Sequence, residues 1–184
     1  MKYPTTNQWI AAGVLAGVVV GFAFVSCSNA DASVYVKAEI GTTIGNEVST
    51  TFGDVEFTDQ ATYGAYVGTA VGPVRVEAGV SHLGGTIDAG FITLDASALD
   101  YNATAYLDTA SGFYVGAGAD YVQGEATVGP FSQDFSGYGW HVSGGYAFSA
   151  AGGIVEAQAT YREIDLGGVD LSGPAVTVGY RRAL

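Results

Sequence analysis

Apolar and polar residues alternate one by one along most of the chain after residue 32. Between 34 and 40 every even-numbered residue is Val, Ala or Ile, and Lys37 and Glu39 stand between them. A period of two is that of a β-strand, whose successive side chains point to opposite faces. Seven further segments share this pattern, at 63–71, 74–80, 99–108, 113–121, 140–148, 155–162 and 175–184. The pattern predicts eight strands of roughly ten residues, which is enough for a tilted strand to cross a bilayer.

The connections between these segments alternate in length. Three are short, at 72–73, 109–112 and 149–153, and four are longer and contain Gly and Asp, at 42–60, 83–97, 123–137 and 163–174. Short turns on one side and long loops on the other are typical of bacterial transmembrane barrels. We therefore expect residues 33–184 to form one all-β domain, an eight-stranded antiparallel up-and-down transmembrane β-barrel with both termini on the periplasmic side.

A soluble β-sandwich or a lipocalin-like barrel would also show alternating residues. The residue types on the two faces of the strands therefore have to distinguish a soluble fold from a membrane barrel. The presumed polar face is rich in glycine, and only 13% of all residues are charged. A narrow, crowded interior suits glycine, whereas the outer surface of a soluble strand carries more Lys and Glu. We therefore expect the apolar face to point outward, toward lipid.

Aromatic residues on the apolar face gather near the strand ends, where rings meet lipid headgroups in membrane barrels. On the long-loop side these are Tyr63, Tyr101, Tyr121, Trp140 and Tyr161, and on the short-turn side Phe113, Tyr146, Phe148 and Tyr180. The alternative is that these rings fill the core of a soluble protein.

Residues 1–32 resemble a secretory signal peptide. Lys2 is followed by an uncharged apolar run over 10–25, and small residues then lead to a cleavage site near 30–32. A transmembrane helix is an alternative, although the run is slightly short for one. In a third interpretation Cys27, the one cysteine of the chain, is a lipidated N-terminus.

Charge and composition exclude several classes of function. The formal net charge is -12, so phosphate backbones would repel the chain and we expect no nucleic-acid partner. We found neither a nucleotide-binding loop nor a His- or Cys-rich spacing, and we expect no cofactor and no metal. Acidic loop residues could attract Ca²⁺ weakly, but a solvated anionic surface explains them more simply.

Three segments resemble the small OmpA/OmpX/opacity-type outer-membrane barrel family, namely 113–119, 139–146 and the terminal 178–181. The resemblance extends at the level of pattern over about residues 33–184. It implies an outer-membrane location, contact with lipopolysaccharide, recognition of the last strand by the barrel-assembly machinery, and a host or cell-surface ligand at the long loops. Members usually end in Phe, whereas this chain ends in Leu184.

Parity along the predicted strands sends most charged residues into the barrel. The expected interior network consists of Lys37, Glu39, Arg75, Glu77, Asp120, His141, Glu156, Arg162 and Arg181. Asp100 points inward by the same rule. Buried charges must be paired, because an isolated one costs several kcal/mol. We predict that Glu156 and Arg181 pair, that Asp120, His141 and Arg162 lie at similar depth, and that the network plugs the lumen.

These observations predict a protein with a structural, adhesion or surface-interaction role and no enzymatic activity. One alternative is a narrow ion channel. Another is a lipid A-modifying hydrolase, because His141 and Ser143 stand on one face of a strand, a spacing similar to that of outer-membrane lipid A deacylases. Parity turns His141 away from lipid, which argues against a hydrolase.

Overall fold

The computed structural model describes residues 33–184 apart from 45–46, 51–52, 57–60, 89–92 and 168. The predicted signal peptide and Cys27 lie outside the described residues. Ten strands form one antiparallel sheet: β1 (Ser33–Thr43), β2 (Glu47–Thr50), β3 (Gly53–Glu56), β4 (Ala61–Val71), β5 (Val74–Asp88), β6 (Thr93–Asp108), β7 (Phe113–Val128), β8 (Phe131–Ala150), β9 (Gly153–Asp165) and β10 (Asp170–Ala183).

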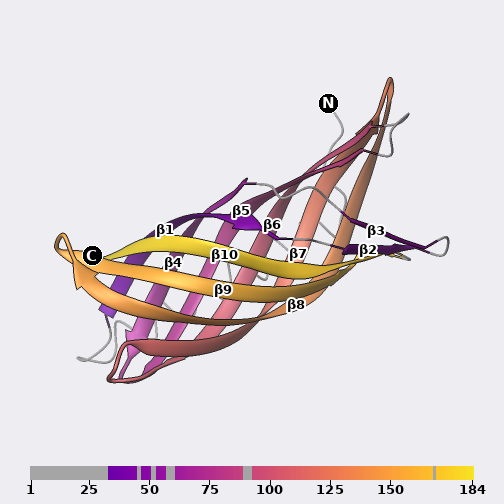
Figure 1. Cartoon of the computed structure of the whole chain (residues 1–184). Coiled ribbons are helices and arrows are strands. Elements are labelled where there is room, and N and C mark those ends of the chain that lie inside the picture. Colours follow the sequence, from indigo (N-terminus) through magenta and orange to yellow (C-terminus); the bar gives the residue numbers. More distant parts are fainter. Residues whose placement is uncertain (1–32, 45–46, 51–52, 57–60, 89–92, 168) are drawn as a thin grey trace, which may run out of the picture.

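Eight of these strands, β1 and β4 to β10, close into a barrel through their pairings. Figure 1 shows the closed barrel, with β2 and β3 projecting from one end. Each strand from β4 to β9 pairs with its successor. β1 pairs with both β4 and β10, and its pairing with β10 runs from Tyr35 opposite Ala183 to Thr43 opposite Ala175. The first and last strands therefore begin and end at the same end of the barrel, together with the short turns. The predicted eight-stranded antiparallel barrel is confirmed. None of the described residues forms a helix long and apolar enough to cross a membrane.

The four stretches predicted as long loops are largely β-structure. The strands are therefore longer than predicted, and the loops between them are shorter. β7 and β8 stay paired from Phe113 opposite Tyr146 out to Val128 opposite Phe131, so residues 123–137 form most of a projecting hairpin. Within 42–60, β2 and β3 form a short hairpin whose first strand pairs with β10. Glycines had suggested loops, but most glycines here stand in regular strands, where the alternation simply continues.

The two faces exchange their polarity along the strands. In β7 the inward residues run from Tyr114 through Asp120 to Val122, while the outward residues change from Ala119 and Tyr121 to Glu125. Below Tyr121 the outward face is apolar, and above it the inward face is apolar. This is expected for strands that cross a lipid layer and continue into water, because the apolar face follows the apolar surroundings.

Interior tyrosines lie over glycines on the neighbouring strand. Four direct cross-strand pairs are of this kind: Tyr35 with Gly68, Tyr66 with Gly79, Tyr106 with Gly116 and Tyr114 with Gly145. A Cβ atom added at any of these glycines would meet the tyrosine ring opposite. The interior glycines therefore make room for large rings in a barrel whose lumen is just wide enough for side chains.

Candidate functional site

The lower part of the lumen, toward the short turns, holds a cluster of buried charges that we call the charge network: Lys37, Glu39, Arg75, Glu77, Asp108, Glu156 and Arg181. Lys37 Nζ lies 2.7 Å from Glu77 Oε2 and 3.3 Å from Glu39 Oε2. Arg75, whose side chain is 0% exposed, forms an ion pair with Glu77. Three cations and four carboxylates thus meet inside the barrel, where few water molecules can screen them.

Glu156 links three strands across this network. Its Oε1 lies 2.9 Å from Arg181 Nε and 3.4 Å from Arg75 Nη1, and its Oε2 lies 4.0 Å from Lys37 Nζ. Asp108 completes the arrangement at the short-turn end, 3.2 Å from Arg75 Nε and 3.8 Å from Arg181 Nη2. The structure therefore brings together the two residues that the sequence pairs, Glu156 and Arg181, and gives Glu156 two further cations.

Tyrosine rings and hydroxyl groups complete the packing around these charges. Tyr35 donates a hydrogen bond to Glu77 at 2.8 Å, and Tyr66 donates one to Glu39 at 2.6 Å. The Arg75 guanidinium lies 4.2 Å from the centroid of the Tyr106 ring. Cation–π contacts of this kind are strongest where the cation is desolvated, so the rings both fill the lumen and stabilise the cations.

A second polar group lies higher in the lumen. His141 Nδ1 lies 2.8 Å from Asp120 Oδ1, and its Nε2 lies 2.8 Å from Thr104 Oγ1. Arg162 is at similar depth but pairs with Asp100, at 3.1 Å between Nη1 and Oδ2. Asp100 also accepts a hydrogen bond from Ser81 at 3.2 Å. The three residues expected at one depth, Asp120, His141 and Arg162, therefore belong to two separate pairs, and Asp100 is the partner of Arg162.

Uncharged polar side chains fill the space between these two groups. Tyr114 donates to Gln158 at 3.2 Å, Gln158 donates to Thr160 at 3.0 Å, and Ser143 and Thr160 share a hydrogen bond at 3.0 Å. The cavity left among these side chains measures about 20 Å³. That volume holds about one water molecule, so side chains fill most of this part of the lumen. We call these uncharged side chains, together with the second polar group, the polar column.

A group of buried apolar side chains lies above the polar column, within the projecting hairpins. Leu83, Ala98, Val122 and Ile164 form this apolar cluster, and Phe135, Leu166 and Leu171 pack against it. Ile164 is 0% exposed. The cluster joins residues of β5–β8 to residues of β9 and β10 and the turn between them.

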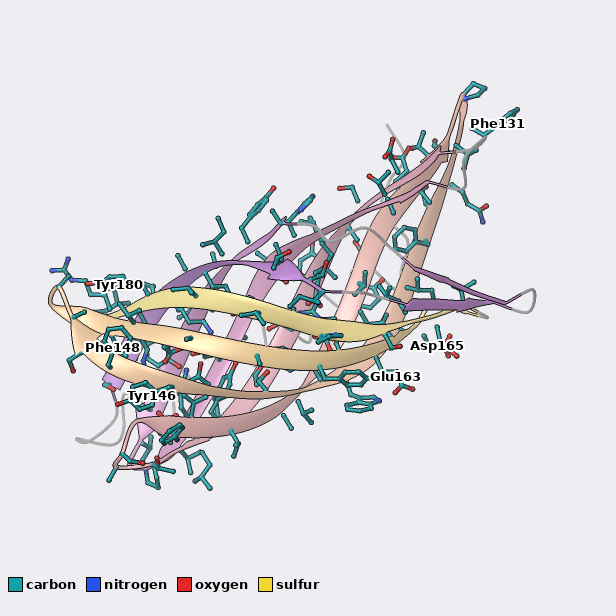
Figure 2. All side chains as sticks on the ribbon, viewed as in Figure 1. Phe131, Tyr146, Phe148, Glu163, Asp165 and Tyr180 are labelled. Carbon is teal, nitrogen blue, oxygen red and sulfur yellow. The ribbon has the colours of Figure 1, made fainter. Side chains whose placement is uncertain are left out.

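The predicted aromatic residues lie on the outer surface in two bands. At the short-turn end Phe113, Tyr146 and Phe148 are exposed, and Tyr180 is half-buried, with its hydroxyl donating to Ala151 O at 3.0 Å. At the other end Tyr63, Trp140 and Tyr161 are exposed, and Tyr101 and Tyr121 are half-buried against each other. Figure 2 shows Tyr146, Phe148 and Tyr180 near one end, with Glu163 and Asp165 toward the other and Phe131 at a hairpin tip.

Three features of the site escaped the sequence analysis. Asp108 belongs to the charge network, and its inward parity in the 99–108 segment was the available signal. Tyr138 extends the aromatic band, with its ring centroid 4.8 Å from that of Tyr121. The apolar cluster carried no clear signal, because Leu83 and Ile164 fall in segments interpreted as loops and Ala98 and Val122 stand directly beside such segments. Among the described residues no group of three or more His, Cys, Asp or Glu is arranged to hold a metal ion.

Comparisons with known proteins identify the fold. Neisserial surface protein A matches with a TM-score of 0.58 and 17% sequence identity, covering 83% of this chain and 99% of that one. The attachment invasion locus protein Ail of Yersinia pestis, solved with the heparin analogue sucrose octasulfate, matches with a TM-score of 0.57 and 14% identity, covering 81% and 99%. No protein-family model and no curated protein sequence matches the chain. The chain therefore has the fold of small outer-membrane barrels.

Proposed function

We propose that this protein is a small outer-membrane barrel whose lumen is closed by its own side chains and whose long hairpins form a contact surface outside the cell. The observation that supports this best is the stacking of two barriers in one lumen. The charge network and polar column fill the membrane-spanning part, and the apolar cluster lies above them. A hydrophobic constriction that excludes water is itself a barrier to ions.

The competing function is that of a narrow ion channel, and conductance in a planar bilayer separates the two. The purified barrel should insert without giving stepwise openings, because the cavity inside the polar column is only about 20 Å³. Reproducible openings in the wild-type protein would support the channel and contradict the closed lumen. A general porin inserted in the same bilayer serves as the positive control for the recording.

The hydrolase alternative finds little support in the geometry. His141 is buried in the lumen against Asp120, and Ser143 shares its hydrogen bond with Thr160 instead of His141. Outside the barrel His82 Nε2 lies 3.1 Å from Ser97 Oγ, but no described carboxylate orients that ring. We therefore propose no enzymatic activity. Mass spectrometry of lipid A from cells that express the protein tests this, and a lipid A species lacking an acyl chain would contradict it.

The charge of the hairpins indicates which kind of partner they fit. The stretches 42–60, 83–97, 123–137 and 163–174 contain no Lys or Arg. On the outer face Glu125 lies directly opposite Asp134, and Asp165 directly opposite Asp170. Like charges in directly opposed positions destabilise a sheet, so these pairs concentrate negative charge at a cost in stability. We propose a basic protein surface as the partner.

The partner proposed here is basic, and it therefore differs in charge from the heparin analogue that is bound to the Yersinia pestis protein. A sulfated polyanion would be repelled by the acidic hairpins, whatever the likeness in fold. Binding of the purified barrel to a lysine-rich protein and to heparin, each immobilised on a sensor, is the test. We expect binding to the lysine-rich protein, weakened by Glu125→Gln with Asp134→Asn, and none to heparin. Binding to heparin alone would contradict the assignment.

The export of the protein and its assembly in the outer membrane are also part of this proposal. We propose that residues 1–32 are removed as a signal peptide and that β10 carries the signal read by the barrel-assembly machinery. We also propose that the aromatic band at the long-hairpin end contacts lipopolysaccharide. Cell fractionation with N-terminal sequencing of the mature protein tests the first point. A mature N-terminus near residues 31–33 supports cleavage, and a lipidated Cys27 contradicts it.

A further inference from the structure

The short-turn end of the barrel opens into a cavity that the function proposed above does not use. It measures about 570 Å³ and is lined by the turn at 149–153 and by Ser33, Tyr35, Ile154, Arg181 and Ala183. Cavities of this size are in the range that holds small molecules. The walls are apolar or small, apart from two serine hydroxyls, a tyrosine ring and one guanidinium group.

Among the described residues that line this cavity, Arg181 is the one that carries a charge, and its hydrogen-bonding capacity is little used. Its side chain is 11% exposed, with Nε 2.9 Å from Glu156 Oε1 and Nη2 3.8 Å from Asp108 Oδ2. The second distance is too long for a hydrogen bond. The Nε atom is buried without a hydrogen-bond partner, despite its closeness to Glu156. A guanidinium group has five N–H donors, so donors remain for a ligand.

The surroundings hold this guanidinium in place. It lies 5.3 Å from the centroid of the Tyr35 ring, which is itself buried and donates its hydroxyl hydrogen to Glu77. Asp108 and Glu156 contact Arg181 from the network side and do not line the cavity. Among the described residues, the lining of the cavity therefore contains one cation, Arg181, and no carboxylate.

We propose that this cavity binds a small molecule that carries an oxyanion, either a carboxylate or a phosphate, on a small apolar body. The oxyanion would accept hydrogen bonds from the Arg181 guanidinium, whose planar fork matches either group. The apolar body would lie against Tyr35, Ile154 and the small residues of the turn at 149–153. A ligand of this class would reach the barrel from the short-turn side, independently of the hairpins at the other end.

Asp108 gives the proposal an unusual test, because it competes with the ligand for the same guanidinium. Asp108 Oδ2 lies 3.8 Å from Arg181 Nη2 without a hydrogen bond, so removing its negative charge should strengthen the attraction of the guanidinium group for an anion and tighten binding, whereas most substitutions at a binding site weaken it. Ser149→Trp would fill the cavity from the turn without touching the charge network. Arg182, the neighbouring arginine, is exposed and does not line the cavity, so Arg182→Gln is a matched control for the loss of a positive charge.

The test is calorimetric titration of the folded barrel in detergent micelles with N-acetylalanine, methyl phosphate and the uncharged methyl ester of N-acetylalanine. The heat-modifiable shift of each variant on a gel establishes that it is folded. We expect the acid or the phosphate to bind and the ester not to bind. Arg181→Lys, which keeps the charge but loses the fork, should weaken binding about tenfold.

We further expect Ser149→Trp to abolish binding, Asp108→Asn to tighten it, and Arg182→Gln to leave it unchanged. The two anions distinguish the sources, since a preference for N-acetylalanine indicates a carboxylate ligand and a preference for methyl phosphate a phosphate ligand. The proposal is overturned if neither anion binds, if the ester binds as well as the acid, or if Arg181→Lys and Ser149→Trp both bind like the wild type.

Discussion

Glu156 Oε1 lies 2.9 Å from Arg181 Nε on the neighbouring strand, and both side chains face the lumen. The same carboxylate lies within 4.0 Å of Arg75 and Lys37, so one residue of β9 contacts cations from β1, β5 and β10. A single buried carboxylate that serves three cations makes the charge network sensitive to its loss.

The first prediction is that Glu156→Gln destabilises the folded barrel by about 3–5 kcal/mol, the usual cost of leaving a buried charge unpaired. The amide keeps the shape of the side chain but no longer balances Arg75, Lys37 and Arg181. Urea unfolding in micelles, followed by the gel shift between folded and unfolded forms, measures the effect. Glu163→Gln is the control, because Glu163 is exposed on the outer face. Equal urea midpoints for both variants would contradict the role assigned to the network.

The second prediction concerns the apolar cluster. Ile164→Ala should lower the free energy of unfolding by about 2–5 kcal/mol, because it removes buried methyl groups and leaves a cavity. Ile40→Ala removes the same atoms from the outer face, where Ile40 is 64% exposed. Lipid or detergent tails would fill that space, so its effect should be much smaller. If Ile40→Ala costs as much as Ile164→Ala, the long-hairpin end is not closed by a packed apolar core.

The third prediction uses two adjacent glycines in β8. A Cβ atom at Gly145 would meet the Tyr114 ring and Ala157 O, whereas at Gly144 its nearest neighbour is Tyr114 O at 3.7 Å. Gly145→Ala should therefore push Tyr114 away from Gln158 and reduce the yield of folded barrel, and Gly144→Ala should not. The folded fraction after refolding into micelles measures both. Equal yields would mean that the interior rings do not depend on the glycines opposite them.

Much of the fold follows from the alternation, since a period of two fixes both the strands and the face of each residue. Arg75, Glu77 and Glu156 are buried, as expected from parity alone. Partners across the lumen were harder to predict, because Lys37 meets Glu77 only through the tilt and stagger of the closed barrel. The lengths of the hairpins were underestimated where Gly and Asp stand in strands that continue into water, and the apolar cluster was missed for the same reason.

The outward apolar face of the barrel should lie in a bilayer, and the fluorescence of Trp140 tests this most directly. Trp140 is 46% exposed on the outer surface, and Trp9, the other tryptophan, lies in the predicted signal peptide. With Trp9 removed by processing or replaced by Phe, the barrel should be reconstituted into vesicles of brominated lipids. Bromine near the glycerol end of the acyl chain should quench Trp140 strongly, and bromine at the chain terminus should quench it less. If neither lipid quenches Trp140, the barrel does not span the membrane and the account is wrong.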